Sequence, residues 1–356
     1  MHQDTFLIKY TNKSSPPVAN RRLSNYLKRD SLRGFTSVER VAKCGVTRFS
    51  NVTLQRYKGR AFFKGLITCG SVNLCPPCSD KILTSRVIEA RTATQNWFSS
   101  GGYLYSATIS LPNSKDLVEL FGASRETWSA VVAGKAWQTD KKQLGLRGYL
   151  LAQEVKFTDK QEWNHHFHIL FFAEQLLGPE ELKNWYSRLT SRWIKRASKL
   201  GFAVSPQAQS IKRVRHSQKD FSRAVSYLFK DSVASIQQPS ASLTTSELLA
   251  AAIKNHEPWA RKAWGEWEVA SKGMAKVRYS HGLKATLGIQ DKPEKLILEH
   301  GHLIEIEPAS IRLLVTNPLI QNRTLLAYEE GGWEEASRFL EQNGISHSIL
   351  VSGESN

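Results

Sequence analysis

Apolar and polar residues along the middle of the chain follow patterns that predict alternating strands and helices. Period-two alternation and short apolar runs indicate strands, whereas apolar residues recurring three and four positions apart indicate helices. The predicted elements, in chain order, are a strand at 103–111, a helix at 117–132, two strands at 149–157 and 163–172, a helix at 179–200, a strand at 208–214 and a helix around residue 227. The polar stretch 158–162 makes the consecutive strands a hairpin. This order predicts an α+β fold, with a central antiparallel sheet and helices on one face.

The second strand of the hairpin carries His166 and His168, two positions apart. Residues two apart in a strand project to the same face, so both imidazoles can bind one ion while His165 faces the other way into packing. If the hairpin is centred near Gln161, Glu154 lies opposite His168 on that face. Two imidazoles and one carboxylate suit a catalytic divalent ion that keeps open coordination positions. Two ordinary half-buried histidines are the alternative.

Farther along, Tyr227 precedes Lys230 by three residues in a helical pattern. Residues three apart share a helical face, so the phenol and the ammonium lie one turn apart. A tyrosine beside a cation is suited to nucleophilic chemistry. The same spacing also arises when the tyrosine is a core residue and the lysine lies on the surface, so the pair is informative only together with the two histidines.

These motifs resemble the rolling-circle replication initiators of small plasmids, in the HUH-endonuclease superfamily, which couple a His-hydrophobe-His metal site to a nicking tyrosine. The resemblance covers about residues 44 to 288. It includes further segments in the usual order of that family: 69–78, the segment around Trp137, 227–230, 246–249 and 279–284. It implies the HUH or RRM-like nuclease fold, a small N-terminal zinc-binding module and a single catalytic tyrosine.

The resemblance also implies an activity and its site residues. Tyr227, assisted by Lys230, would nick one strand at the plasmid double-strand origin, forming a 5'-phosphotyrosine link and a free 3'-hydroxyl primer, and would rejoin the strand at termination. Glu154, His166 and His168 would hold Mn²⁺ or Mg²⁺. The expected enzyme is therefore a metal-dependent, site-specific nickase and strand transferase.

Some members of that family place a glutamate one helical turn before the tyrosine, where it activates water when replication ends. Arg223 occupies that position here, and the nearest carboxylates are Asp220 and Asp231. The resemblance therefore leaves open whether termination uses a water activated by a carboxylate.

All four cysteines lie close together, as Cys44, Cys69, Cys75 and Cys78. In a cytoplasmic protein, such a cluster indicates a structural zinc site with four thiolate ligands rather than disulfides. A redox Cys-x-x-Cys is the alternative, but it would not require the first two cysteines. A short ribbon is expected at 51–65 and a helix at 79–94.

The chain has 356 residues and a formal net charge of +17, which predicts attraction to polyanions such as nucleic acid. From Leu296 onward, nine acidic residues stand against three basic ones, so the first 295 residues carry +23. The basic residues that bind DNA are therefore expected before Leu296. We expect no membrane segment, because no run of about 18 apolar residues occurs. Without a secretory signal, a cytoplasmic location is expected.

Five regions are predicted: a basic flexible arm at 1–40, a zinc-binding module at 41–95, an endonuclease core at 96–235, a helical family-specific extension at 236–295 and an acidic region of unknown role at 296–356. The expected partners are plasmid origin DNA, single-stranded or hairpin at the nick, and the host helicase and replication machinery. The oligomeric state stays open.

Two other functions are compatible with these motifs. One is an HUH relaxase or a transposase-type strand transferase, which would differ in the DNA that it cuts. The other is a non-catalytic, zinc-containing DNA-binding protein, in which Tyr227 would have no chemical role.

Overall fold

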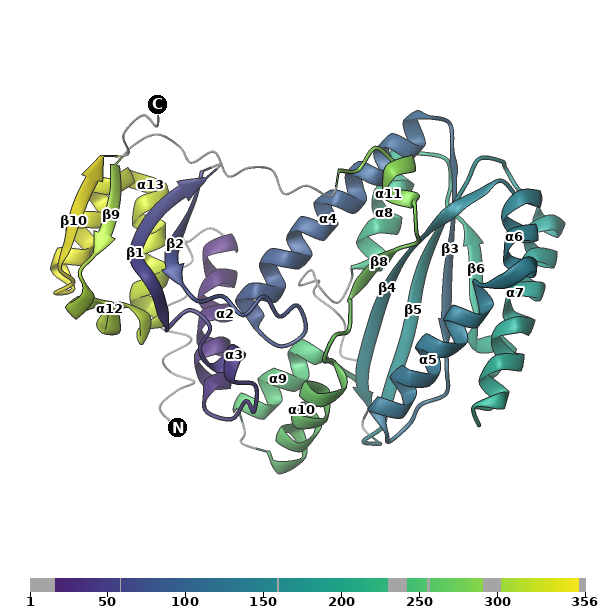
Figure 1. Cartoon of the computed structure of the whole chain (residues 1–356), viewed down its shortest axis with the longest axis horizontal. Coiled ribbons are helices and arrows are strands. Elements are labelled where there is room, and N and C mark those ends of the chain that lie inside the picture. The colour runs from purple at the N-terminus through teal and green to yellow at the C-terminus, as the bar shows by residue number, and fades with distance from the viewer. Residues whose placement is uncertain are drawn as a thin grey trace. The chain divides into compact units, whose positions relative to one another are not determined.

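The computed structural model describes residues 17–57, 59–158, 160–229, 242–254, 257–290 and 302–351. These residues form two compact units (Figure 1). Unit 1 contains the described residues up to Ser79 together with those from His302 onward, and unit 2 contains the described residues from Asp80 to Gln290. Each unit has an antiparallel sheet and helices, which confirms the mixed α and β class.

The predicted hairpin lies at the centre of the unit 2 sheet. Its strands are β3 (Tyr103–Ser110), β4 (Leu146–Thr158), β5 (Trp163–Ala173), β6 (Ser210–Arg213), β7 (Ser242–Thr244) and β8 (Val277–Tyr279). The strand order is β6-β3-β5-β4-β7, and β8 also pairs with β4. The hairpin strands β4 and β5 therefore have neighbours on both sides, which holds them rigidly.

Helices cover both faces of this sheet, so the prediction of helices on one face is wrong. The helices of unit 2 are α4 (Pro76–Ser99), which begins in unit 1, α5 (Leu117–Val131), α6 (Gly134–Gln143), α7 (Pro179–Lys199), α8 (Gln218–Leu228), α9 (Thr245–Lys254), α10 (Pro258–Ala270) and α11 (Leu283–Thr286). Among the described helices, none is both long and apolar enough to cross a membrane.

The composition of β5 explains why both faces are covered. From Phe167 to Ala173 every residue of β5 is buried, and all are apolar except His168. On one face, Trp128 of α5 and Trp193 of α7 lie against Phe167, with ring centroids 6.2 and 6.1 Å away. On the other face, α4, α8 and α11 pack with Phe172 in one apolar cluster. A strand that is apolar on both sides requires cover on both sides.

Unit 1 has a second sheet of order β10-β9-β1-β2. Its elements are α2 (Pro17–Arg33), α3 (Glu39–Ala42), β1 (Arg48–Tyr57), β2 (Arg60–Leu66), β9 (His302–Ile306), α12 (Pro308–Val315), α13 (Pro318–Gln342) and β10 (His347–Val351). The ribbon expected at 51–65 is confirmed as β1 and β2.

The C-terminal strands β9 and β10 belong to this sheet, whereas the sequence predicted a separate acidic region at 296–356. Strand β9 pairs with β1, so that Leu54 lies opposite Ile304, and both side chains are fully buried. Leu325 of α13 packs in the same apolar cluster. A two-stranded ribbon leaves its apolar face exposed to water, and the C-terminal segment covers it.

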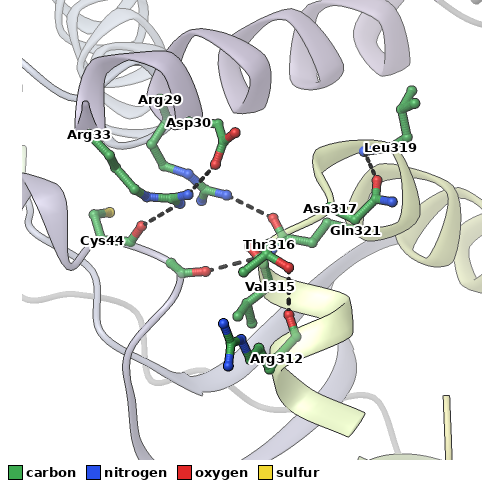
Figure 2. Close-up of polar contacts among 11 residues, drawn as sticks. Arg29, Asp30, Arg33, Cys44, Arg312, Val315, Thr316, Asn317, Leu319 and Gln321 are labelled. Atoms are coloured by element: carbon green, nitrogen blue, oxygen red, sulfur yellow. Dashed lines mark hydrogen bonds and ion pairs between the residues drawn. The ribbon is translucent and has the colours of Figure 1, made fainter. Parts of the chain in front are cut away.

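Residues 17–33 form helix α2, which differs from the flexible arm expected at 1–40. Leu23 and Leu32 are buried, and the buried Arg29 donates to Oε1 of Gln321 on α13 at 2.7 Å (Figure 2). The segment has few apolar positions, and its helix is stabilised by packing against distant residues rather than by a local pattern.

Ile304→Ala tests whether β9 belongs to the core of unit 1. Because Ile304 is fully buried against β1, we expect the free energy of unfolding to fall by about 2–5 kcal/mol. Leu350→Ala on β10 is the matched control: its side chain is 39% exposed, and a change of about 0.5 kcal/mol is expected. Urea unfolding followed by circular dichroism measures both, and equal effects would contradict the assignment.

Candidate metal and nucleophile site

Glu154, His166 and His168 lie on one face of the β4–β5 hairpin. The register pairs Glu154 with His166 and Ala152 with His168, whereas the predicted pairing was Glu154 with His168. The hairpin is centred one residue before Gln161, and this moves the cross-strand partner by two positions. Because side chains alternate with period two, a shift of two leaves each side chain on its original face. The three candidate ligands therefore still meet.

The carboxylate of Glu154 lies close to both histidines and to a lysine. Its Oε2 lies 2.5 Å from Nε2 of His168 and 3.7 Å from Nδ1 of His166, and its Oε1 lies 3.2 Å from Nζ of Lys156. Nδ1 of His168 lies 3.1 Å from Oγ1 of Thr108 on β3, which orients the ring.

This donor set fits one divalent ion. The three ligand atoms lie within 4.8 Å of one another. Ligands about 2.1 Å from a common ion would be about 3.0–3.5 Å apart, so only small movements are needed. Two imidazoles and one carboxylate leave further coordination positions for a substrate, and they do not by themselves select one metal.

His165 faces the opposite side of β5, as predicted. It is buried, and its ring lies 4.9 and 4.8 Å from the rings of Phe121 and Phe167. Its Nε2 lies 3.0 Å from Oε1 of Gln153 and its Nδ1 lies 2.9 Å from Oγ of Ser124. An amide oxygen only accepts, so Nε2 carries the proton. Burial lowers the pKa of His165 to about 3, which keeps the imidazole neutral.

Helix α8 brings Tyr227 to the candidate metal group. The helix begins at Ser217, whose Oγ accepts from the N–H of Asp220 at 3.1 Å. Three apolar residues of α8 are buried in the cluster against the sheet: Phe221, Val225 and Leu228. Tyr227 lies on another side of the helix, is 41% exposed, and has its ring centroid 5.0 Å from that of His168. A nucleophile candidate and a ligand candidate are therefore neighbours.

Among the other predicted catalytic residues, the structure describes only Asp220, and it does not place Asp220 beside the metal group. Lys230 and Asp231 lie outside the described residues. Asp220 accepts from Oγ of Ser217 at 2.7 Å and pairs with Arg223 at 3.5 Å. It precedes Tyr227 by seven residues, which is about 10 Å along the helix axis. Asp220 thus supports the N-cap residue Ser217 in the first turn of α8.

Two lysines near the site were missed in the sequence. Lys156 follows Glu154 by two residues on β4, and the period-two rule could have identified it as a neighbour on the same face. Nζ of Lys212, on β6, lies 5.7 Å from the ring centroid of Tyr227. Nothing in the local sequence relates β6 to α8, because Lys212 reaches Tyr227 only through tertiary packing.

The four cysteines form a second candidate metal group. The Sγ–Sγ distances are 3.6 Å for Cys44–Cys78, Cys69–Cys78 and Cys44–Cys75. Four thiolates around a tetrahedral zinc ion, each at about 2.3 Å, would lie about 3.8 Å apart. A disulfide would instead require about 2.05 Å. The cluster therefore has the geometry of a closed metal site, and Cys44 is part of it.

The loop that carries Cys44 is held by buried polar contacts. Arg33 of α2 donates to the carbonyl oxygen of Cys44 at 3.2 Å, and Figure 2 draws this hydrogen bond as a dashed line. Gln321 donates to the carbonyl oxygen of Gly45 at 3.4 Å. Gly45 has φ 70°, and a Cβ there would lie 2.2 Å from Nη1 of Arg29. The position thus requires glycine. Hydrogen bonding with Cys69 lowers the pKa of the Cys44 thiol, which favours a thiolate.

Comparisons with known proteins agree with the expected class. In an alignment 359 residues long, the chain is 20% identical to a protein called "Protein rep" from Streptomyces lividans. The alignment covers 81% of this chain and 76% of that protein. Over 138 residues it is 26% identical to a "Neomycin resistance protein" from Streptomyces cyanogenus, covering 32% of each chain. No family model and no solved structure matches the chain.

Metal binding at the hairpin is expected to need His166 and His168 but not His165. Loss of either ligand should lower the affinity for Mn²⁺, measured by calorimetric titration, at least about 10-fold, since even residues behind the ligands contribute that much. His165→Ala should keep the affinity and lower the free energy of unfolding by about 1–3 kcal/mol, because Ser124 and Gln153 lose their partner. Equal loss of Mn²⁺ in all three variants would contradict the geometry.

The cysteine cluster is expected to hold about one metal ion per chain, since closed sites take four ligands. Elemental analysis would be done on protein carrying His166→Ala, so that the hairpin does not contribute. In that background Cys78→Ser should lose the ion and Ser79→Ala should retain it. Retention of the ion by Cys78→Ser would exclude the four-thiolate site.

Proposed function

We propose that this chain is a plasmid rolling-circle replication initiator of the HUH-endonuclease type, which nicks one strand of origin DNA through a single tyrosine. The observation that carries the proposal is the 5.0 Å separation between the rings of Tyr227 and His168, where His168 belongs to a group of three potential ligands. The similarity to "Protein rep" over most of both chains supports the same class.

The reaction is a transesterification in which Tyr227 is the nucleophile. The phenol oxygen attacks phosphorus in line with the departing 3'-oxygen, so that one P–O bond forms and one breaks. The phenol proton is lost and the 3'-oxygen gains a proton, which leaves a 5'-phosphotyrosine and a free 3'-hydroxyl. Attack of a 3'-hydroxyl on the phosphotyrosine reverses the reaction and rejoins the strand.

Glu154, His166 and His168 would hold the divalent ion, Mn²⁺ or Mg²⁺. When bound, such an ion neutralises charge on the non-bridging phosphate oxygens. The protein contributes ligands that are already oriented: Thr108 holds the ring of His168, and Lys156 holds one oxygen of Glu154. Ligands fixed on a sheet keep the substrate in the geometry that attack requires. Lys230 would assist as a cation near the phosphate.

The four cysteines would hold Zn²⁺ with a structural role. Thiolate ligands brought together only in the folded chain convert the binding free energy of the ion into folding free energy. The cluster lies in unit 1, away in sequence from Tyr227, so its loss would first affect the fold of that unit and, through it, origin recognition.

The DNA partner is proposed from charge and from the similarity to "Protein rep". The +23 charge before Leu296 would bind the phosphates of origin DNA, whereas base contacts would select the site. The host helicase would unwind the nicked duplex, the host replication machinery would extend the free 3'-hydroxyl, and the protein would work in the cytoplasm.

Tyr227→Phe tests the nucleophile. With labelled origin DNA and Mn²⁺, the unaltered protein should form a covalent adduct that survives a denaturing gel, and the variant should form none because it lacks the attacking oxygen. DNA binding, measured by fluorescence anisotropy, should persist.

Tyr186→Phe is the matched control for that experiment. Tyr186 lies on α7, and burial raises its pKa above the ordinary value of a tyrosine, so its hydroxyl is poorly suited to attack. This variant should form the adduct normally. A normal adduct from Tyr227→Phe would refute the assignment, and cleavage only of conjugative transfer DNA would favour a relaxase.

A further inference from the structure

Two exposed cations lie near Tyr227, one on a neighbouring strand and one on its own helix. Lys212 extends from β6, with Nζ 5.7 Å from the ring centroid of Tyr227, and its side chain is exposed. Arg223 precedes Tyr227 by four residues on α8, which places the two side chains on neighbouring turns of one helix face. The side chain of Arg223 is 70% exposed.

The existing contacts of these cations leave them available for a ligand. Arg223 pairs with Asp220 at 3.5 Å on the surface, and an exposed ion pair of this length contributes little to stability. Lys212 lies on β6, which within the described sheet occupies an edge and pairs with β3. Both charges can therefore reach a chain that passes over the tyrosine from solvent.

Surfaces that bind a single nucleic-acid strand combine cations with exposed aromatic rings, and Tyr227 with the two nearby cations offers both. Backbone phosphates pair with the cations, while a base can stack on an exposed ring. A guanidinium can also bind a phosphate through two parallel hydrogen bonds. A duplex would hold its phosphates on a stiff outer surface, whereas a single strand can bend to present one phosphate to Tyr227 and its neighbours to the cations.

We propose that Lys212 and Arg223 bind backbone phosphates of the single DNA strand next to the phosphate that Tyr227 attacks. The identity of the strand rests on the proposed function, whereas the phosphate-binding surface itself rests on the positions of the two cations. They act by holding the strand in register with the tyrosine and with the group of Glu154, His166 and His168.

The test is the salt dependence of binding to a labelled single-stranded oligonucleotide of about 20 nucleotides, long enough to cover one such surface. Binding is followed by fluorescence anisotropy over a range of NaCl concentrations, in the Tyr227→Phe background so that no covalent link contributes. Each lost phosphate contact should reduce the log–log slope by about 0.7, so Lys212→Ala with Arg223→Ala should reduce it by about 1.4.

The matched control is Lys135→Ala with Lys142→Ala. Both lysines are exposed on α6, which packs with the sheet face opposite to the site, and the change in net charge is the same. The control should leave the slope unchanged within experimental error. The double variant Lys212→Arg with Arg223→Lys should also retain the full slope, because both charges persist. An unchanged slope in the alanine pair, or an equal change in the control, would overturn the proposal.

The two proposals fail in different ways. If the unaltered protein forms no adduct but the slope falls as expected, the nicking function is refuted and the phosphate-binding pair stands. If the adduct forms and the slope does not change, only the pair is refuted.

Discussion

The pairing of β4 with β5 fixes the position of every candidate ligand in unit 2. On the face that carries the site, β5 is polar in its first half, with His166 and His168, and apolar in its second half, with Leu170 and Phe172. Helices α4 and α8 pack with the apolar half, and the exposed Tyr227 lies where the two halves meet, beside His168. One strand therefore both buries α8 and presents the ligands that its tyrosine would need.

The local features of this site could be predicted because they depend on short-range periodicity. The hairpin, the shared face of His166 and His168, and the opposite face of His165 all follow from alternation within one strand. The pairing of Glu154 was misplaced by two residues, and the error was harmless because two is the period of a strand. A shift of one residue would have put the carboxylate on the face of His165.

The features that the sequence did not predict depend on partners far along the chain. Strand β9 pairs with β1 across about 250 residues, and α2 becomes helical against α13. Lys212 reaches Tyr227 only after β6 has paired with β3 and α8 has packed on the sheet. The packing of helices on both faces of the sheet is the one such feature that local sequence does indicate, because the unbroken apolar run in β5 implies burial of both faces.

The two candidate metal groups differ in the number of coordination positions that they would leave open on a bound ion, and this difference suits them to different roles. Four cysteines can surround an ion completely, so an ion bound there would have no position for a substrate and would stabilise the folded unit 1. That unit also buries Arg29, whose charge is costly to remove from water and whose guanidinium donates a hydrogen bond to Gln321 of the C-terminal segment. The hairpin group supplies three potential ligands beside an exposed tyrosine, and three ligands would leave coordination positions open for a substrate. The proposed chemistry therefore requires the open group, whereas the proposed role of the closed group, like that of the C-terminal segment, is to stabilise the fold of unit 1.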